Sequence, residues 1–401
     1  MPGPLQGYRI VDLTSMISGP SATMLLADQG AEVIKVENPK GGGDHTRAAA
    51  NRRAGVSASF LNNNRNKRSI ALDLKAPGAL QALMRIVASA DVFVQNFRSG
   101  VAERIGLGES DVRAVAPDIV YVSISGFGEH GPFAAKPVYD PLVQALSGLA
   151  TVQAGSDDAP PRLVRTILPD KLTGITAAQA ITAALLARAR SGQGQHVQLS
   201  MLDAVIAFLW GSDMGSQTFV GDEFPQQEGA SFIDLIYATA DAYISVAVQT
   251  DREWTALTRA LERPEWLQDV RFKTPALRQQ NINERLQMTQ EVLKTRSAAE
   301  WLERLTAEGV PCAPVLTRTQ VLRHPQVLAN GIVVETEHPT AGRLRQARPA
   351  ARFSGTPATI RSGAPALGAH TRETLAEQGY SAAEIDALAG HATAAAGEGN
   401  A

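Results

Sequence analysis

The sequence predicts an α/β protein with a Rossmann-like large domain, built on a parallel sheet, and a smaller α/β domain. Short β-rich runs alternate with helical patterns through the first hundred residues, which is typical of a parallel sheet covered by helices on both faces. The chain has 401 residues, more than the roughly 100 to 200 of a typical domain. We therefore expect two domains, or one large domain with a smaller one inserted.

The first elements form a compact β-α-β unit. We expect a strand at 8–13, a helix at 19–29 and a strand at 32–36. Gly30 is well placed to end the helix, because glycine accepts the left-handed conformation found there. A polar stretch at 38–67 follows and is expected to be a functional loop. Further strands are predicted at 69–74, 92–94 and 119–125, with helices at 77–89 and 100–105.

The pattern changes after Gln195. Residues 196–210 indicate another strand followed by a helix, whereas 211–232 are polar and contain glycine without a clear period. The predicted division is the N-terminal part of the large α/β domain at 1–200, a linker at 201–232, the small domain at 233–315, and a return linker with the C-terminal part of the large domain at 316–401. The small domain is expected to have a strand at 243–248 and helices at 251–261, 283–294 and 297–308. The last part is expected to have strand-like pieces and one helix, at 382–388.

Composition excludes several classes of protein. Lys and Arg total 38 against 40 Asp and Glu, so no global field attracts nucleic acid or an anionic membrane. The N-terminus lacks the pattern of a signal peptide, and no uninterrupted apolar run reaches the ~18 residues that span a bilayer. We expect a cytoplasmic protein without a metal site. Cys312 is the single cysteine, which excludes an intramolecular disulfide, and its apolar surroundings predict a buried residue.

Cations gather where two predicted strands end. Arg98 and Arg104 follow the strand at 92–94, and Lys75 follows the strand at 69–74. Ligands of open parallel sheets bind outside the carboxyl ends of the strands, so these cations indicate a phosphorylated ligand, with Phe97 offering a ring to its base. The segment 62–68, with three cations and four amides, is either a phosphate site or a solvated turn. The P-loop, Gly-x-Gly-x-x-Gly and Gly-x-Ser-x-Gly signatures are absent.

Asp170 stands in the run Leu168-Pro169-Asp170-Lys171-Leu172-Thr173-Gly174, ahead of an Ala-rich stretch that continues to Ala189. Two interpretations are open from these residues alone. Asp is a favoured helix N-cap, since its carboxylate accepts from unpaired N–H groups. Alternatively, Asp170 is a nucleophile.

Short motifs recur in order along the chain. They are Gly19-Pro20-Ser21-Ala22-Thr23, Gly30-Ala31-Glu32-Val33-Ile34-Lys35-Val36-Glu37 with Gly43-Asp44 and Arg47, Asn64-Arg65-Asn66-Lys67-Arg68-Ser69-Ile70, Tyr139-Asp140 with Ser147-Gly148, Gly309-Val310-Pro311, His338-Pro339 with Gly342, Arg352-Phe353-Ser354, Thr356-Pro357, and Leu367-Gly368 with His370-Thr371. Together they resemble the class III CoA-transferase family from about Gly7 to Leu388. The resemblance implies an interlaced homodimer of ring-shaped chains.

The resemblance also implies that Asp170 is the nucleophile. Its carboxylate attacks a donor acyl-CoA to give a mixed anhydride, and the thiolate returns to form an aspartyl-CoA thioester, which a small carboxylic acid then opens. An ordinary Asp pKa near 4 leaves the group ionised at pH 7. Coenzyme A and acyl-CoA are thus substrates, and no cofactor is bound permanently. Backbone N–H donors must stabilise the oxyanion, and water must be excluded.

Residues that match the family's CoA contacts can be named one by one. They are Ser15, Ile17, Leu72, Leu74, Lys75, Asn96, Phe97, Arg98, Arg104 and Tyr139. Lys75, Arg98 and Arg104 are the expected phosphate partners. Asn38 stands where some members have an Arg, and Lys136 is a candidate to supply the missing cation.

Two alternative functions remain open: an α-methylacyl-CoA racemase of the same fold, or a CoA-binding protein without catalysis. Tyr139 replaces the His that racemases use as a proton acceptor, which favours transfer. Segment 225–231 lacks the Gly run of oxalate-using members, so a formate or oxalate exchange is disfavoured and a dicarboxylate of the succinate type is the candidate acceptor. Met201, Trp210 and Phe232 line an acyl pocket or are core residues.

Overall fold

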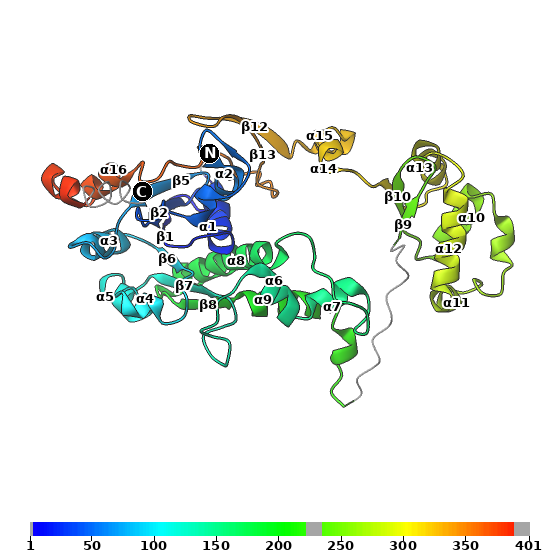
Figure 1. Ribbon diagram of the computed structural model, residues 1–401, viewed down its shortest axis with the longest axis horizontal. Helices are drawn as coiled ribbons and strands as arrows, with labels where there is room; N and C mark the ends of the chain where they lie inside the picture. Colours follow the sequence, from blue (N-terminus) through cyan, green and yellow to red (C-terminus); the bar gives the residue numbers. More distant parts are fainter. Residues whose placement is uncertain (1–2, 222–234, 389–401) are drawn as a thin grey trace. The chain divides into compact units, whose positions relative to one another are not determined.

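The structure is a computed structural model that describes residues 3–221 and 235–388 (Figure 1). Within these ranges the chain divides into two compact units. Unit 1 contains the described residues up to 154, 160–221 and 331–388, and unit 2 contains 155–159 and 235–330. Both ends of the chain therefore contribute to unit 1.

Unit 1 is built on a parallel sheet of six strands in the order β5-β2-β1-β6-β7-β8. The strands are β1 (Arg9–Asp12), β2 (Glu32–Glu37), β5 (Lys67–Ala71), β6 (Val92–Gln95), β7 (Val120–Ser125) and β8 (His196–Ser200). Numbered within the sheet, this order is 3-2-1-4-5-6, the Rossmann order, so the predicted parallel sheet is confirmed. The order reverses between β1 and β6, and such a switch point leaves a crevice at the carboxyl ends of the two strands.

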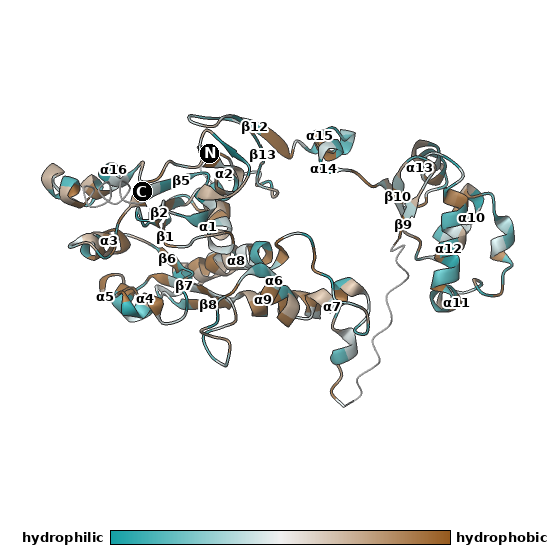
Figure 2. Ribbon diagram, in the orientation of Figure 1, coloured by the Kyte–Doolittle hydropathy of each residue, from teal (hydrophilic) through white to brown (hydrophobic). Residues whose placement is uncertain are grey.

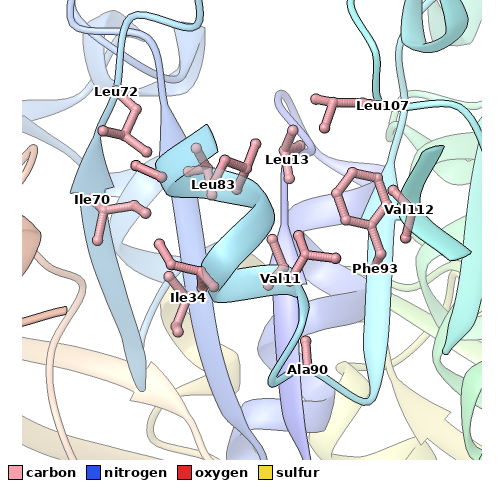
Figure 3. Close-up of a cluster of buried hydrophobic side chains, with 14 of the residues drawn as sticks. Val11, Leu13, Ile34, Ile70, Leu72, Leu83, Ala90, Phe93, Leu107 and Val112 are labelled. Carbon is pink, nitrogen blue, oxygen red and sulfur yellow. The ribbon is translucent and has the colours of Figure 1, made fainter. Parts of the chain in front are cut away.

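Alternate residues of each strand enter two different cores, because successive side chains of a strand point to opposite faces. On one face, Val11, Ile34 and Phe93 pack with Leu83 of α3 (Ala79–Val87) and Val112 of α5 (Glu109–Val115) (Figure 3). The neighbouring strand residues pack on the other face against α1 (Ser18–Asp28) and α8 (Leu168–Ser191), which lie side by side (Figure 1). As predicted, Gly30 follows α1 with a φ of +107°.

Helix α8 begins at the Asp170 segment and is the one described helix whose length and composition would allow it to cross a membrane. Its residues Ala177, Ile181, Ala184 and Leu185 are nevertheless buried in the core between the sheet and α1. Core helices of soluble proteins pass the same test of length and hydropathy. One face of α8 is therefore packed in the core of unit 1, while Ile175 and Leu186 on the same helix are exposed.

The polar stretch at 38–67 is structured rather than one long loop. It contains η1 (His45–Ala48), a small hairpin of β3 (Arg52–Arg53) and β4 (Val56–Ser57), and α2 (Ala58–Asn63). Short capped elements of this kind have no long hydrophobic period, so the sequence pattern did not indicate them. Ser57 caps α2 by accepting from the backbone N–H of Phe60.

The C-terminal part of the chain returns along the free edge of β5. Ser69 N–H donates to Nδ1 of His370 (3.1 Å), and the N–H of Ala71 donates to the hydroxyl of Thr371 (2.9 Å). Before this return lies a hairpin of β12 (Val333–His338) and β13 (Gly342–Ala347), and after it lie α16 (Thr371–Glu377) and a helical segment over 382–388. The sequence predicted the last of these but missed α16, which is only seven residues long.

The predicted linker at 201–232 begins too early. Residues 201–210 form helix α9 (Met201–Trp210), which Ser200 caps and whose Val205 and Leu209 are buried. Its mostly apolar sequence suits a helix packed in unit 1. The other short elements of unit 1 are α4 (Val101–Arg104), α6 (Asp140–Leu146), α7 (Leu149–Ala154) and η2 (Gly215–Gln217).

Unit 2 has a three-stranded antiparallel sheet, β11-β10-β9, packed on helices. Trp254, Trp266 and Trp301 fill its core. Cys312, in β11, is partly exposed rather than buried as predicted, because its short edge strand leaves one side open. The unit extends past the predicted end at 315 to Asn330. Its elements are β9 (Ile236–Ala238), β10 (Tyr243–Val246), α10 (Asp251–Ala260), η3 (Pro264–Leu267), α11 (Pro275–Gln280), α12 (Ile282–Leu293), α13 (Ala298–Ala307), β11 (Cys312–Pro314), α14 (Arg318–Val321) and α15 (Pro325–Asn330).

Candidate active site at the switch point of the sheet

The loop between β1 and α1 meets the end of β6 at the switch point. The N–H of Ser15 donates to Oδ1 of Asn96 (3.0 Å), and Nδ2 of Asn96 donates to the carbonyl of Ser15 (2.9 Å). This reciprocal pair joins two residues that the family resemblance named as CoA contacts. The ligand crevice that the strand order implies is therefore bordered by both of them.

A largely apolar pocket opens beside this pair. Four of the predicted CoA contacts besides Ser15 line it: Leu72, Leu74, Lys75 and Phe97. It also contains residues that the sequence did not single out as ligands, among them Asp44, His45 and Asp73, and it contains Asn38, the position where the family pattern has an Arg in some members. We call this cavity the strand-end pocket.

A second, more polar cavity lies next to it and shares Phe97. Its walls include Asn96, Arg98, Lys136 and Met201, and it also reaches Ser18, the first residue of α1. We call it the serine pocket. The ammonium of Lys136 lies 3.3 Å from the centre of the Phe133 ring, so this exposed cation is held at the rim. Met201, for which a core and a pocket role were both open, is buried and lines the serine pocket.

Asp170 is placed against Ser18. It lies in the first turn of α8, but the N-cap position belongs to Ile167, so Asp170 is not the N-cap that the sequence allowed. Instead, its carboxylate accepts hydrogen bonds from the backbone N–H and the hydroxyl of Ser18. Ser18 opens α1, so the carboxylate sits at the positive ends of two helices.

The pKa of Asp170 is raised to about 6. Burial is the main cause, and the nearby negative charge of Asp140 adds to it, while the two hydrogen bonds from Ser18 oppose the rise. The expected ordinary pKa near 4 is therefore wrong, although the group is still mostly ionised at pH 7. A carboxylate that has lost much of its water is also a stronger nucleophile.

Asp140 is the residue of the site whose role the sequence did not reveal. It is 4% exposed, in the first turn of α6, and its Oδ2 lies 3.4 Å from the backbone nitrogen of Asp170. Gln144 orients it by donating from Nε2 to Oδ1 (2.6 Å). The motif Tyr139-Asp140 was a signal for the family, but neither spacing nor period showed that it meets Asp170, because α6 is short and 30 residues away.

Gly174 allows α1 and α8 to approach closely. A Cβ atom at this position would lie 2.1 Å from Oγ of Ser21 and 2.9 Å from the carbonyl oxygen of Ser18. Any larger residue would therefore push the two helices apart. The glycine of the Asp170 motif sets the distance between Asp170 and Ser18.

The predicted phosphate partners are exposed, whereas the cations of segment 62–68 are paired with carboxylates. Lys75, Arg98 and Arg104 are exposed, and none of them forms an ion pair with a carboxylate among the residues described. By contrast, the segment 62–68 is neither a phosphate site nor a solvated turn. Its cations are paired inside the protein: Arg65 with Asp28, Lys67 with Asp12, and Arg68 with Glu32 and Glu377.

The remaining predicted residues are less enclosed. Tyr139 is 67% exposed at the N-cap of α6, and Ile17 is partly exposed at the N-cap of α1. Trp210 is 49% exposed at the end of α9, so it is not a core residue of this chain. Phe232 and the segment 225–231 lie outside the described residues. No group of three His, Cys, Asp or Glu side chains suited to a metal ion occurs in the part of the chain that the structure describes.

Comparisons with known proteins agree with this architecture. A family model described as CoA-transferase family III matches residues 5–371. The succinyl-CoA:glutarate CoA-transferase of Mus musculus is 35% identical over 379 residues, which cover 93% of this chain and 86% of that protein. The formyl-CoA:oxalate CoA-transferase of Escherichia coli is 32% identical over 414 residues, covering 97% and 99%. The crystal structure of a CAIB/BAIF family protein from Brucella suis is similar with a TM-score of 0.82 at 30% identity, covering 94% of this chain and 100% of that chain.

Proposed function

The chain belongs to CoA-transferase family III, and we propose that it passes coenzyme A from an acyl-CoA donor to a small carboxylic acid through covalent intermediates on Asp170. The observation that carries this proposal is the placement of Asp170. Its carboxylate is largely desolvated and accepts from Ser18, which lines the serine pocket beside the strand ends where ligands of such sheets bind.

The chemistry proceeds in two matched halves. A carboxylate oxygen of Asp170 bonds to the thioester carbonyl carbon, the C–S bond breaks, and a mixed anhydride and CoA thiolate result. The thiolate then attacks the aspartyl carbonyl, which releases the donor acid as a carboxylate and leaves aspartyl-CoA. In the second half, the acceptor carboxylate attacks aspartyl-CoA and expels the thiolate, which attacks the acceptor carbonyl and frees Asp170. Each step forms one acyl bond as another breaks, so no redox partner is needed.

The two pockets provide the binding site for coenzyme A. The apolar walls of the strand-end pocket, with Leu72, Leu74 and Phe97, suit the adenine ring and the pantetheine chain. Lys75, Arg98 and Arg104 supply charge-assisted hydrogen bonds to the phosphates. Because Phe97 borders both pockets, a ligand in the first can extend its thioester into the second, whose wall includes Ser18, the partner of Asp170.

A dicarboxylic acid is the acceptor that we propose. Three exposed cations, Arg162, Arg165 and Lys171, flank Asp170 in sequence, and none forms an ion pair with a carboxylate in the described ranges. The stretch that carries Arg165 is tied to the site, since Oε1 of Gln144 accepts from the N–H of Val164 (2.9 Å). One carboxylate of the acceptor would react while the other is neutralised by these cations. A relative named for glutarate supports this choice.

We also propose a homodimer. Helices α6, α8 and α9 contain many hydrophobic residues (Figure 2). Several large apolar side chains on them are left in water by a single chain, including Ile175 (60%) and Phe208 (52%). Monomeric proteins rarely leave patches of this kind uncovered. The others on these helices are Leu142, Leu146, Leu186 and Trp210. Sedimentation of a stable, fully active monomer would contradict the proposal.

The covalent step is tested by trapping. The protein is incubated with a panel of acyl-CoAs, treated with hydroxylamine and mapped by peptide mass spectrometry. We expect a hydroxamate at Asp170, and none in Asp170→Asn, which should still bind coenzyme A. Deuterium uptake at the α-carbon of the acyl group without any adduct would instead support the racemase reaction. Binding without either event would leave only a CoA-binding protein.

A further inference from the structure

Two lysines are buried completely beneath the loop that joins β1 to α1 (residues 13–17, the β1–α1 loop). Lys35 of β2 and Lys67 of β5 both have side chains with 0% exposure. Nζ of Lys35 lies 2.9 Å from Asp44, and Nζ of Lys67 lies 3.0 Å from Asp12, whose side chain is equally buried. Removing such charges from water costs about as much as their pairing returns, so stability alone is a weak reason for them.

The four groups are ionised together at pH 7, although burial lowers the pKa of Lys67 to about 8. Burial alone would raise the pKa of Asp12, but the charges of Lys67 and Lys35 hold that pKa well below its usual range. In the same way, burial opposes the charge of Lys35, but Asp12 and Asp44 raise its pKa above the usual value. No coenzyme phosphate can reach either ammonium, since both are fully enclosed. A direct ligand role is thus excluded.

Three of the four charged groups bond directly to the backbone of the β1–α1 loop, and Lys67 is linked to the loop through Asp12. Nζ of Lys35 donates to the carbonyl of Thr14 (2.7 Å), and Oδ1 of Asp12 accepts from the Thr14 N–H (2.9 Å). Oδ1 of Asp44 accepts from the N–H of Met16 (3.3 Å). Met16 has a φ of +72°, a left-handed conformation that costs free energy for a side chain of this kind and persists only where its surroundings enforce it.

The conformation of this loop decides two contacts of the site. Ser15 bonds to Asn96 from within it, and Ser18, directly after it, donates to Asp170. If the loop relaxed at Met16, the direction in which α1 presents Ser18 would change. The thioester and the carboxylate would then lose their common alignment, to which reaction rates are very sensitive.

We propose that Asp12, Lys35, Asp44 and Lys67 are positioning residues, whose buried ion pairs hold the β1–α1 loop in the one conformation that presents Ser18 to Asp170. The proposal rests on the proposed role of Asp170. It explains why the motifs around Lys35 and Lys67 belong to the family pattern although neither ammonium can reach the ligand.

The test measures the single-turnover rate of adduct formation at Asp170 with saturating acyl-CoA, and the fraction of sites that react. Lys35→Met removes the charge and keeps the chain length, and we expect the rate constant per reactive site to fall about 30- to 100-fold, while the KM for acyl-CoA rises less than about tenfold. Arg65→Met is the matched control. It breaks a buried ion pair with Asp28 (2.7 Å) that makes no contact to the β1–α1 loop, so it should lower the unfolding temperature and leave the rate constant within about twofold.

Asp44→Asn is the milder variant if Lys35→Met does not fold. The amide oxygen can still accept from Met16, but the ion pair is lost, and we expect a smaller fall, about three- to tenfold. Equal rate constants per site in Lys35→Met, Asp44→Asn and the wild type would overturn the positioning role. An absent adduct in the wild type with every donor would instead defeat the function proposed for Asp170. In that case a crystal structure of Asp44→Asn tests whether the ion pair holds the β1–α1 loop. An unchanged Met16 conformation and an unchanged Ser18–Asp170 contact would overturn the positioning role.

Discussion

Oδ2 of Asp140 lies 3.4 Å from the backbone nitrogen of Asp170, so the Asp140 carboxylate supplies the acceptor that Ile167, the N-cap of α8, cannot offer. The same carboxylate raises the pKa of Asp170. The N–H groups of a first helical turn need an acceptor, and Asp140 supplies one from α6. The same negative charge makes ionisation of Asp170 less favourable. Asp140 thus affects both the start of helix α8 and the ionisation of Asp170. A substitution that removes its charge but keeps an acceptor oxygen separates the two effects.

Asp140→Asn should lower the pKa of Asp170. In the wild type, adduct formation needs the ionised carboxylate, so its rate should rise with pH through about 6 and level off above. Without the Asp140 charge, the midpoint should move down by on the order of half to one pH unit, because burial, the larger cause, remains. The measurement is the pH profile of single-turnover adduct formation. Asp203→Asn, which removes an exposed first-turn carboxylate of α9, should leave the midpoint in place.

Asp170→Asn should stabilise the protein while it abolishes the adduct. The raised pKa means that the folded state binds a proton more tightly than the unfolded state, so this group's contribution to stability falls as pH rises from about 4 to about 6. At pH 7.5 the charged side chain costs up to roughly 3 kcal/mol, of which an amide should recover about 1 to 3 kcal/mol. Thermal unfolding at pH 7.5 and pH 5 measures this. A variant that gains no stability at the higher pH, relative to pH 5, would contradict the prediction.

Gly174→Ala should separate α1 from α8. The new Cβ would lie 2.1 Å from Oγ of Ser21, so the helices must move, at a cost of about 1 to 3 kcal/mol in the free energy of unfolding. The same movement weakens the bonds from Ser18 to Asp170, and the rate of adduct formation should fall with stability. Ser21→Ala, combined with Gly174→Ala, should recover part of both losses. No recovery in the double variant would show that the clash with the Ser18 carbonyl dominates.

Neutralising the exposed cations should weaken coenzyme binding without harming the fold. For Lys75→Gln, Arg98→Gln and Arg104→Gln, we expect the KM for acyl-CoA to rise about five- to fiftyfold each, with a weaker dependence of binding on salt. Arg190→Gln, on the exposed last turn of α8, is the control for a general change of charge. Binding is measured by calorimetry with free coenzyme A at two salt concentrations, and equal affinities for a variant and the wild type would remove that residue from the site.

The predictions made from the sequence were confirmed where a regular hydrophobic period determines a helix or strand, or where the charge of a side chain determines its exposure. The strands of the parallel sheet and the helix after Asp170 have strong periods, and the cations at the strand ends stand where the topology predicts a ligand. Lys67 shows the limit. Its neighbours in the chain are polar, yet it is fully buried against Asp12, 55 residues earlier, and only the fold brings the two together. The contact between Asp140 and Asp170 could not be predicted for the same reason, since only tertiary structure brings the two residues together.

The return of the chain along β5 has a consequence for synthesis on the ribosome. His370 and Thr371 accept hydrogen bonds from the edge strand β5, which is synthesised about 300 residues earlier. Until these residues are made, the unpaired backbone groups of β5 are open to pairing with other chains. Unit 2 emerges before these residues and can fold while β5 is still open. The order of translation therefore leaves the nascent sheet dependent on protection until its own C-terminal segment arrives.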